Sequence, residues 1–161
     1  MKKTRSALAL AMALVAMGWL PALAAPESAA LPFNLEQVVN YFQDALGKPP
    51  AQTHGRAYLF VEGDGRGESM MIAVSGTRRQ LAVVLAATGD WGVSTFKEFF
   101  EAPFFRRSES EQMYRLLYAN PPPRSAALER FRVKVGAFER PGWTIIRLDF
   151  SPPVPDRNLK P

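Results

Sequence analysis

Residues 56–87 have the sequence RAYLFVEGDGRGESMMIAVSGTRRQLAVVLAA, and this stretch decides the fold. Three runs rich in branched, aromatic and other apolar residues, at 56–62, 68–75 and 78–87, are separated by glycine-containing turns at 63–67 and 76–77. Runs of this length between such turns are typical of strands joined as hairpins. The stretch therefore predicts an antiparallel meander of three strands.

The third run is apolar on both of its expected faces. One face carries larger side chains than the other: Leu81, Val83 and Leu85 against Ala82, Val84 and Ala86. A strand that is apolar on both sides is typically central in its sheet. We expect the face of smaller residues to leave room for a packed helix.

A helical pattern precedes the meander. Apolar residues recur at helical spacing between Asn34, which is a good N-cap with Gln37 three residues later, and Gly47, which is a typical helix terminator. The polar face of this segment carries Glu36 and Asp44 and lacks the cations that anionic lipid attracts. We interpret it as a core-facing helix rather than a membrane-surface helix.

Two further helices are expected after the meander. Ser94 or Thr95 caps the first, which carries part of a dense set of phenylalanines at positions 96, 99, 100, 104 and 105. We expect these rings to pack against the small-residue face of the third strand. Ser108 and Glu111 predict a capping box for the second helix, which ends before the prolines at 121–123.

The chain closes with a second hairpin, at 130–138 and 143–150, turned by Pro141 and Gly142. The element order is helix, three strands, two helices, two strands. This order predicts an α+β fold, with an antiparallel sheet of about five strands and helices packed on one face. Residues 25–150 form a single globular domain in this interpretation, and the proline-rich residues 151–161 form a flexible tail.

The first 24 residues resemble a secretory signal peptide. Lys2, Lys3 and Arg5 precede an uncharged run at 7–20, and Ala-Leu-Ala at 22–24 supplies the small residues that a signal peptidase recognises. We expect cleavage after Ala24 and a periplasmic or secreted protein. A retained membrane anchor is the weaker alternative, because a spanning helix needs about 20 apolar residues.

Composition removes several classes of function. Loss of residues 1–24 takes away three cations and lowers the formal charge from +5 to +2, so no nucleic-acid partner is expected. The chain has no cysteine and one histidine, His54, which removes thiolate nucleophiles and sites that need two imidazoles. No metal or other cofactor is expected.

Two weak motifs do not predict a site. The glycines at 63–67 precede a strand, whereas a phosphate cradle requires a helix there. Ser69 lacks the following glycine of a nucleophile elbow, because Met71 stands in that position, and a triad would have to recruit the lone His54. No catalytic residue is predicted from either motif.

Two alternative functions remain open. Asp90 paired with Glu98 or Glu101, beside the aromatic residues, would suit a small hydrolase that uses two carboxylates. Phe99, Phe104 and Met113 would line the apolar pocket of a carrier.

The last hairpin carries the sharpest functional prediction. With Pro141 and Gly142 at the centre of the turn, Phe131, Val133, Val135 and Ala137 point inward and Lys134 lies opposite Asp149, which neutralises it. Three arginines then remain without an obvious partner near an aromatic residue, so the predicted ligand-binding residues are Arg130, Arg132, Arg147 and Trp143.

Arginine forks of this kind suit carboxylate and phosphate groups. We therefore predict a non-catalytic binding module for an envelope macromolecule or an anionic glycan or lipid. The alternative is that these cations only discourage aggregation near a sheet edge.

Overall fold

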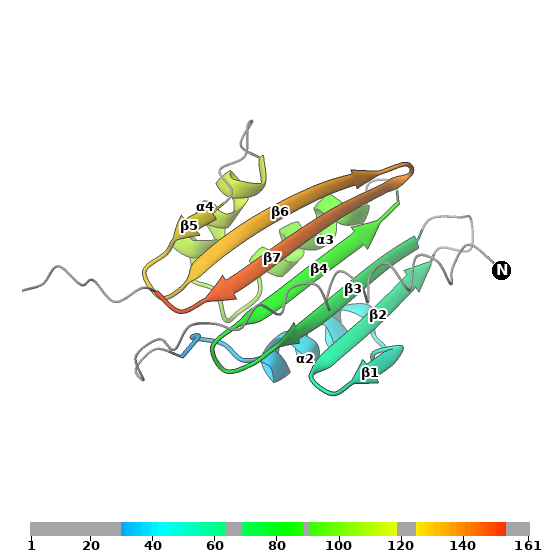
Figure 1. Ribbon diagram of the computed structural model, residues 1–161, viewed down its shortest axis with the longest axis horizontal. Helices are drawn as coiled ribbons and strands as arrows, with labels where there is room; N and C mark the ends of the chain where they lie inside the picture. The colour runs from blue at the N-terminus through cyan, green and yellow to red at the C-terminus, as the bar shows by residue number, and fades with distance from the viewer. Residues whose placement is uncertain (1–29, 64–68, 89–90, 119–124, 154–161) are drawn as a thin grey trace, which may run out of the picture.

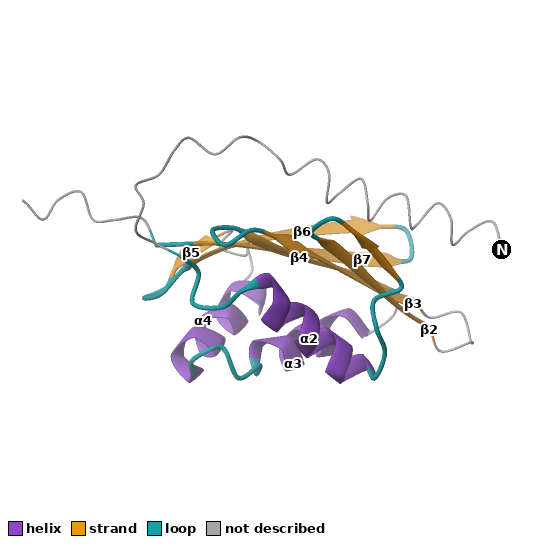
Figure 2. Ribbon diagram, turned by 90° about the horizontal axis from the view of Figure 1, so that it is seen from below, coloured by secondary structure: helices purple, strands orange, loops and turns teal. Residues whose placement is uncertain are grey.

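The structure is a computed structural model that describes residues 30–63, 69–88, 91–118 and 125–153. Within these residues, three helices lie on one side of an antiparallel sheet of seven strands (Figures 1 and 2). The helices are α2 (Leu35–Leu46), α3 (Trp91–Phe100) and α4 (Arg107–Tyr118). The strands are β1 (Gln52–His54), β2 (Ala57–Gly63), β3 (Ser69–Gly76), β4 (Leu81–Ala87), β5 (Ser125–Ala127), β6 (Arg132–Arg140) and β7 (Trp143–Ser151).

The predicted α+β fold with helices on one face is confirmed, and the sheet has seven strands rather than five. Its order is β1-β2-β3-β4-β7-β6-β5. The two additional strands, β1 and β5, are three residues long and lie at the edges (Figure 1). They lack a run of alternating apolar residues, and only their pairing with β2 and β6 makes them strands.

The predicted meander and its central strand are confirmed. Strands β2, β3 and β4 pair in sequence, and β4 lies between β3 and β7. The second hairpin has the predicted register, with Val135 opposite Leu148, because Pro141 and Gly142 form a two-residue turn in which Gly142 has a φ of 76°. That left-handed value suits glycine at this turn position.

Helix α2 begins and ends as predicted. The side chain of Asn34 accepts a hydrogen bond from the Gln37 backbone N–H, and the Gln37 side chain accepts one from the Asn34 N–H. Gly47 ends the helix with a φ of 64°.

The other two helix starts were predicted wrongly. Helix α3 begins at Trp91 rather than near Thr95, and α4 begins at Arg107 rather than at a cap on Ser108. At the start of α4, the backbone N–H of Arg106 donates to the carboxylate of Glu109. The N-cap position is therefore Arg106, two residues before the predicted Ser108. Ser110 instead donates its hydroxyl to the carbonyl of Phe100, which fixes the connection between the two helices.

Phenylalanine rings fill the layer between helices and sheet. Phe99 is fully buried, and its ring centroid lies 5.1 Å from that of Phe42 and 5.4 Å from that of Phe105. The β4 residues in this layer are Leu81, Val83, Leu85 and Ala87, so it holds the three larger side chains of the strand's central part. The expectation that the helices cover the small-residue face of β4 was therefore wrong. Large rings pack against large aliphatic side chains, and the smaller residues face the other way.

Candidate functional site

The face of the sheet opposite the helices carries a second apolar cluster. We call this side the second face, and we call the cluster the apolar strip; its residues are Leu59, Val61, Met71, Ala73, Val84, Ala86, Trp143 and Ile145. They come from β2, β3, β4 and β7, which are adjacent in the sheet. None of the described helices lies on this side (Figure 2).

The strand register arranges the strip in two main rows across the sheet. Leu59, Ala73 and Val84 pair with one another in the first row. The second row continues from Val61 through Met71 and Ala86 to Ile145, with Trp143 beyond it on β7. Alternation of side chains along each strand places all of them on one face. Six of the eight are buried, and Val61 and Trp143 are half-buried.

Charged residues border the strip on the side of β6 and β7. Val84 pairs with Arg147, so the guanidinium-bearing residue continues the first row. Arg147 binds the carboxylate of Asp149 on its own strand, with Nη2 2.7 Å from Oδ1. Arg132 and Lys134 are exposed on the same face of β6, where Lys134 lies opposite Asp149. We call Arg132, Lys134 and Arg147 the cationic border, and with Asp149 it carries a net charge of +2.

Three of the four predicted ligand-binding residues thus lie together on the second face. Trp143 packs against the apolar strip, and Arg147 and Arg132 lie in its border. Asp149 accepts hydrogen bonds from Arg147, whereas the sequence prediction assigned it to Lys134. Ala137 lies on the helix side of the sheet as predicted, opposite Ile146, and is exposed near the turn.

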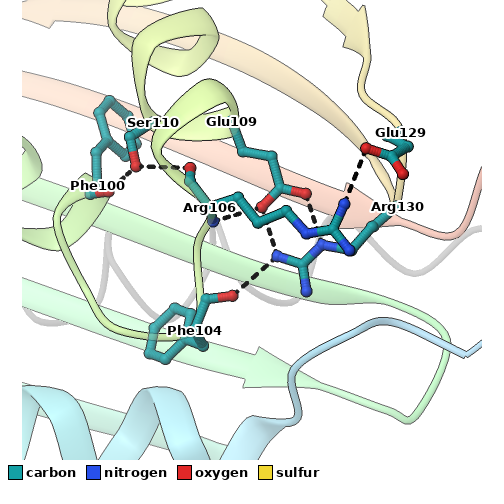
Figure 3. Close-up of polar contacts among 7 residues, drawn as sticks. All are labelled: Phe100, Phe104, Arg106, Glu109, Ser110, Glu129 and Arg130. Atoms are coloured by element: carbon teal, nitrogen blue, oxygen red, sulfur yellow. Dashed lines mark hydrogen bonds and ion pairs between the residues drawn. The ribbon is translucent and has the colours of Figure 1, made fainter.

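Arg130 was predicted to lie without a partner beside the other arginines, and this is wrong. Its guanidinium donates to both carboxylate oxygens of Glu109 and to the carbonyl of Phe104 (Figure 3). Glu109 is buried within α4, on the helix side of the sheet, with 2% of its side chain exposed. Arg130 lies before β6 begins, so the alternation of that strand does not fix where its side chain points.

The Glu109 contacts form a polar joint between α4 and the segment that leads into β6. Arg106 takes part twice, because its backbone N–H donates to Glu109 and its guanidinium lies 2.9 Å from the carboxylate of Glu129 (Figure 3). Burial raises the pKa of Glu109, but the hydrogen bonds from Arg130 and Arg106 outweigh it and hold that pKa below its ordinary value. The joint is structural, because each of its charges has a partner within it.

The geometry gives little support to the alternative of a hydrolase that uses two carboxylates. Glu98 and Glu101 are exposed at the end of α3, and both face Tyr41. Burial, together with these two charges, raises the pKa of Tyr41 to about 12. The hydroxyl of Tyr114 lies 3.2 Å from a carboxylate oxygen of Glu101. Asp90, the proposed partner of these acids, lies outside the described residues.

The carrier alternative placed its pocket among residues that fill the core. Phe99 and Met113 are buried at 0% and 1% exposure, and Phe104 packs against the same cluster. An open groove of about 510 Å³ does lie nearby, between α2 and the chain that follows α3. Its lining includes Asn40, Tyr41 and Asp44, and Asp44 is its only charged residue, so it does not suit an anion.

The remaining sequence motifs add no site. His54 is exposed on the short edge strand β1, and most of the glycine loop at 63–67 lies outside the described residues. Among the residues that the structure describes, no group of three histidine or acidic residues is arranged to hold a metal ion. None of the described helices is long and apolar enough to cross a membrane.

The sequence signal for the apolar strip was present but incomplete. Apolar residues alternate on both faces of β2, β3 and β4, and sequence reasoning noted this only for β4. Which face the helices would cover could not be deduced from that pattern. No protein-family model, no curated protein and no solved structure matches this chain.

Proposed function

We propose that the protein is an exported, non-catalytic binding module of the cell envelope that binds an anionic lipid on the second face of its sheet. One observation carries this proposal: an apolar strip and a cationic border lie side by side on the same face. Trp143 and Ile145 belong to the strip, and Arg147 follows them on the same strand with the same orientation.

This juxtaposition fits the two parts of an amphiphile. Acyl chains lie against the half-buried members of the strip, Val61 and Trp143, where burial of apolar area stabilises the complex. The headgroup phosphate lies over the border, where arginine presents two parallel donors and lysine adds a point charge. A sheet face that no described helix covers, with half-buried apolar side chains next to a charged border, suits an interaction site.

Export is part of the proposal and rests on the first 24 residues. Their positive start, uncharged run and small residues at 22 and 24 favour delivery to the envelope, where anionic lipid is abundant. A binding role is favoured over hydrolysis because Glu98 and Glu101 are exposed beside Tyr41 of α2, in the helix layer and away from the strip.

Vesicle binding tests the proposal. Processed protein, purified from the envelope of a Gram-negative host that expresses the whole chain, is mixed with vesicles of phosphatidylcholine alone or with added phosphatidylglycerol, and co-sedimentation is measured. We expect binding only to the anionic vesicles, and weaker binding at about 0.5 M salt because the headgroup contacts are screened.

A charge-matched pair of variants makes the test specific to the site. Arg132→Gln with Lys134→Gln removes two cations of the border, and at about 1 kcal/mol for each cation we expect a loss of about thirtyfold in affinity. Lys97→Gln with Arg115→Gln removes two exposed cations from the helix layer and should change the affinity less than twofold. Equal losses in both variants would show that net charge alone drives binding and would refute the site.

A further inference from the structure

The helix side of the protein has an open groove that the lipid proposal does not use. The groove lies between α2 and the chain that follows α3, and its volume is about 510 Å³. It is on the opposite side of the sheet from the apolar strip (Figure 2). Its lining residues all belong to the described part of the chain: Gln37, Asn40, Tyr41, Asp44, Ala45, Pro103 and Phe104. An occupant of this groove would leave the second face free.

Two aromatic rings belong to the lining of the groove. The ring centroids of Tyr41 and Phe104 lie 6.1 Å apart, and the ring planes are at 80° to each other. Both side chains are half-buried, so part of each ring is open to an occupant. Aromatic faces attract cations, and they also pack against the apolar stems of lysine and arginine side chains. A purely apolar occupant would instead cut Asn40 and Asp44 off from water without giving them partners.

The distribution of unpaired carboxylates shows that the surroundings of the groove are acidic. Five of the carboxylates whose side chains the structure describes are in ion pairs: Glu62, Glu109, Glu111, Glu129 and Asp149. The described carboxylates that are in no ion pair are Glu36, Asp44, Glu98 and Glu101. These four lie in α2, in α3 or directly after α3, which are the segments on the two sides of the groove.

The carboxylates of Glu98 and Glu101 act on the groove through Tyr41. Burial and then these two charges raise the pKa of Tyr41 to about 12, so both carboxylates lie near a ring of the lining. Lys97 stands four residues before Glu101, but within the described residues it makes no ion pair with it. The whole chain has a formal charge of +5, so this acidic character is local and opposes the charge of the protein as a whole.

The open shape of the groove suits a segment of a polymer. Small-molecule sites enclose most of the ligand surface, whereas this groove leaves one side of its occupant in solvent. Gln37 and Asp44 are seven residues apart on α2, so the lining runs about 10 Å along the helix. About three residues of extended peptide cover this length. Side chains two residues apart in such a peptide point to the same side, about 7 Å from each other.

We propose that this groove binds an extended basic segment of a partner protein, in which one arginine lies against Tyr41 and Phe104 and donates to the carboxylate of Asp44. A guanidinium suits this position because it is planar, stacks on aromatic rings and presents parallel donors to a carboxylate. A second basic side chain, two residues along the segment, lies toward Glu98 and Glu101 at the end of α3. The inference goes beyond lipid binding and does not depend on it.

Peptide titration tests the proposal. Isotope-labelled processed protein, prepared as for vesicle binding, is titrated with acetyl-Gly-Arg-Gly-Arg-Gly-amide, and its backbone amide shifts are followed by NMR. We expect saturable shifts in α2 and residues 101–104, and weaker binding at about 0.5 M salt. The same peptide with citrulline in place of both arginines keeps the shape and loses the charge. It should bind at least about tenfold more weakly, because hydrogen bonds between charged groups are lost.

A charge-matched pair of variants locates the contact. Asp44→Asn removes the carboxylate of the groove at an exposed position and should weaken binding of the arginine peptide at least about tenfold. Glu111→Gln removes one exposed carboxylate of α4 and should change the affinity less than twofold. Thermal unfolding of both variants checks that neither substitution alters the fold.

Four results would overturn the inference. The first is the absence of saturable shifts in α2 at millimolar arginine peptide, and the second is equal binding of the citrulline peptide. The third is an equal loss of affinity in Asp44→Asn and Glu111→Gln, which would show that net charge alone attracts the peptide. The fourth is binding of spermidine at least as tight as that of the arginine peptide, with the same residues shifted, which would assign the groove to a small polyamine. Vesicle binding concerns the other face of the sheet, so its failure would leave the peptide result unchanged.

Discussion

The two faces of strand β4 are built differently although both are apolar. On the helix side, Val83 and Leu85 lie under a dense network of phenylalanine rings contributed by α2, α3 and the segment after α3. On the second face, Val84 and Ala86 belong to a shallow strip of small and medium side chains with charges at its border. One face is therefore committed to the core, whereas the other carries a shallow apolar strip that no described helix covers.

Lysine at neighbouring positions of β4 gives the largest test of this difference. Val83→Lys buries an unpaired ammonium among the rings and should prevent stable folding. Val84→Lys should cost only about 1 kcal/mol, because no described helix covers this face and the long side chain can bring its charge to water. Urea unfolding of both variants, followed by circular dichroism, measures the effect. Equal destabilisation would mean that the second face is as much a part of the core as the first.

The ion pair on the helix side should contribute more to stability than the ion pair on the second face. Glu109 is 2% exposed and its partner Arg130 is 23% exposed, so Glu109→Gln leaves a mostly buried guanidinium without its carboxylate and should cost about 3 kcal/mol. Asp149 is 37% exposed in its pair with Arg147, and Asp149→Asn should cost about 1 kcal/mol or less. Urea midpoints of the two variants decide this, and a larger loss for Asp149→Asn would reverse the comparison.

Acid should weaken the helix side through Glu109. Its pKa in the folded protein is below the ordinary value of 4.5, so the unfolded chain takes up the proton first as the pH falls. The stability that this carboxylate contributes is complete above the ordinary value and is lost as the pH falls through the folded pKa. We expect the free energy of unfolding to decline more steeply below about pH 4.5 in the parent than in Glu109→Gln. Parallel declines in the two proteins would contradict the assignment.

The sequence supplied those parts of the fold whose partners are near in the chain. The capping box of Asn34 and Gln37 spans three residues, and the hairpin register follows from Pro141 and Gly142. The same local reasoning misplaced the start of α4, because several polar residues there can act as caps. The cap that forms is the hydrogen bond from the Arg106 backbone N–H to the Glu109 carboxylate, not one at Ser108. The edge strands β1 and β5 were missed because three residues carry no periodicity.

The candidate site also has a part that could be predicted from local sequence and a part that depends on contacts between distant segments. Alternation along β6 and β7 was enough to place Arg132, Arg147 and Trp143 on one face. Arg130 escaped prediction because its partner, Glu109, lies 21 residues earlier and meets it only when α4 packs beside the entry to β6. The apolar strip escaped because its strands are also apolar on the helix side, so the pattern did not distinguish the two faces.

The sequence by itself therefore determined the longer strands, the presence of three helices, the two hairpins and the alternation that gives each of these strands two faces, because short-range turns and the period of two fix these features locally. Only the tertiary structure decided that β7 lies beside β4, that the phenylalanines cover the larger residues of β4, and that the cationic border continues the apolar strip. Those outcomes depend on how well side chains from distant segments fill shared space, and no local pattern encodes that fit.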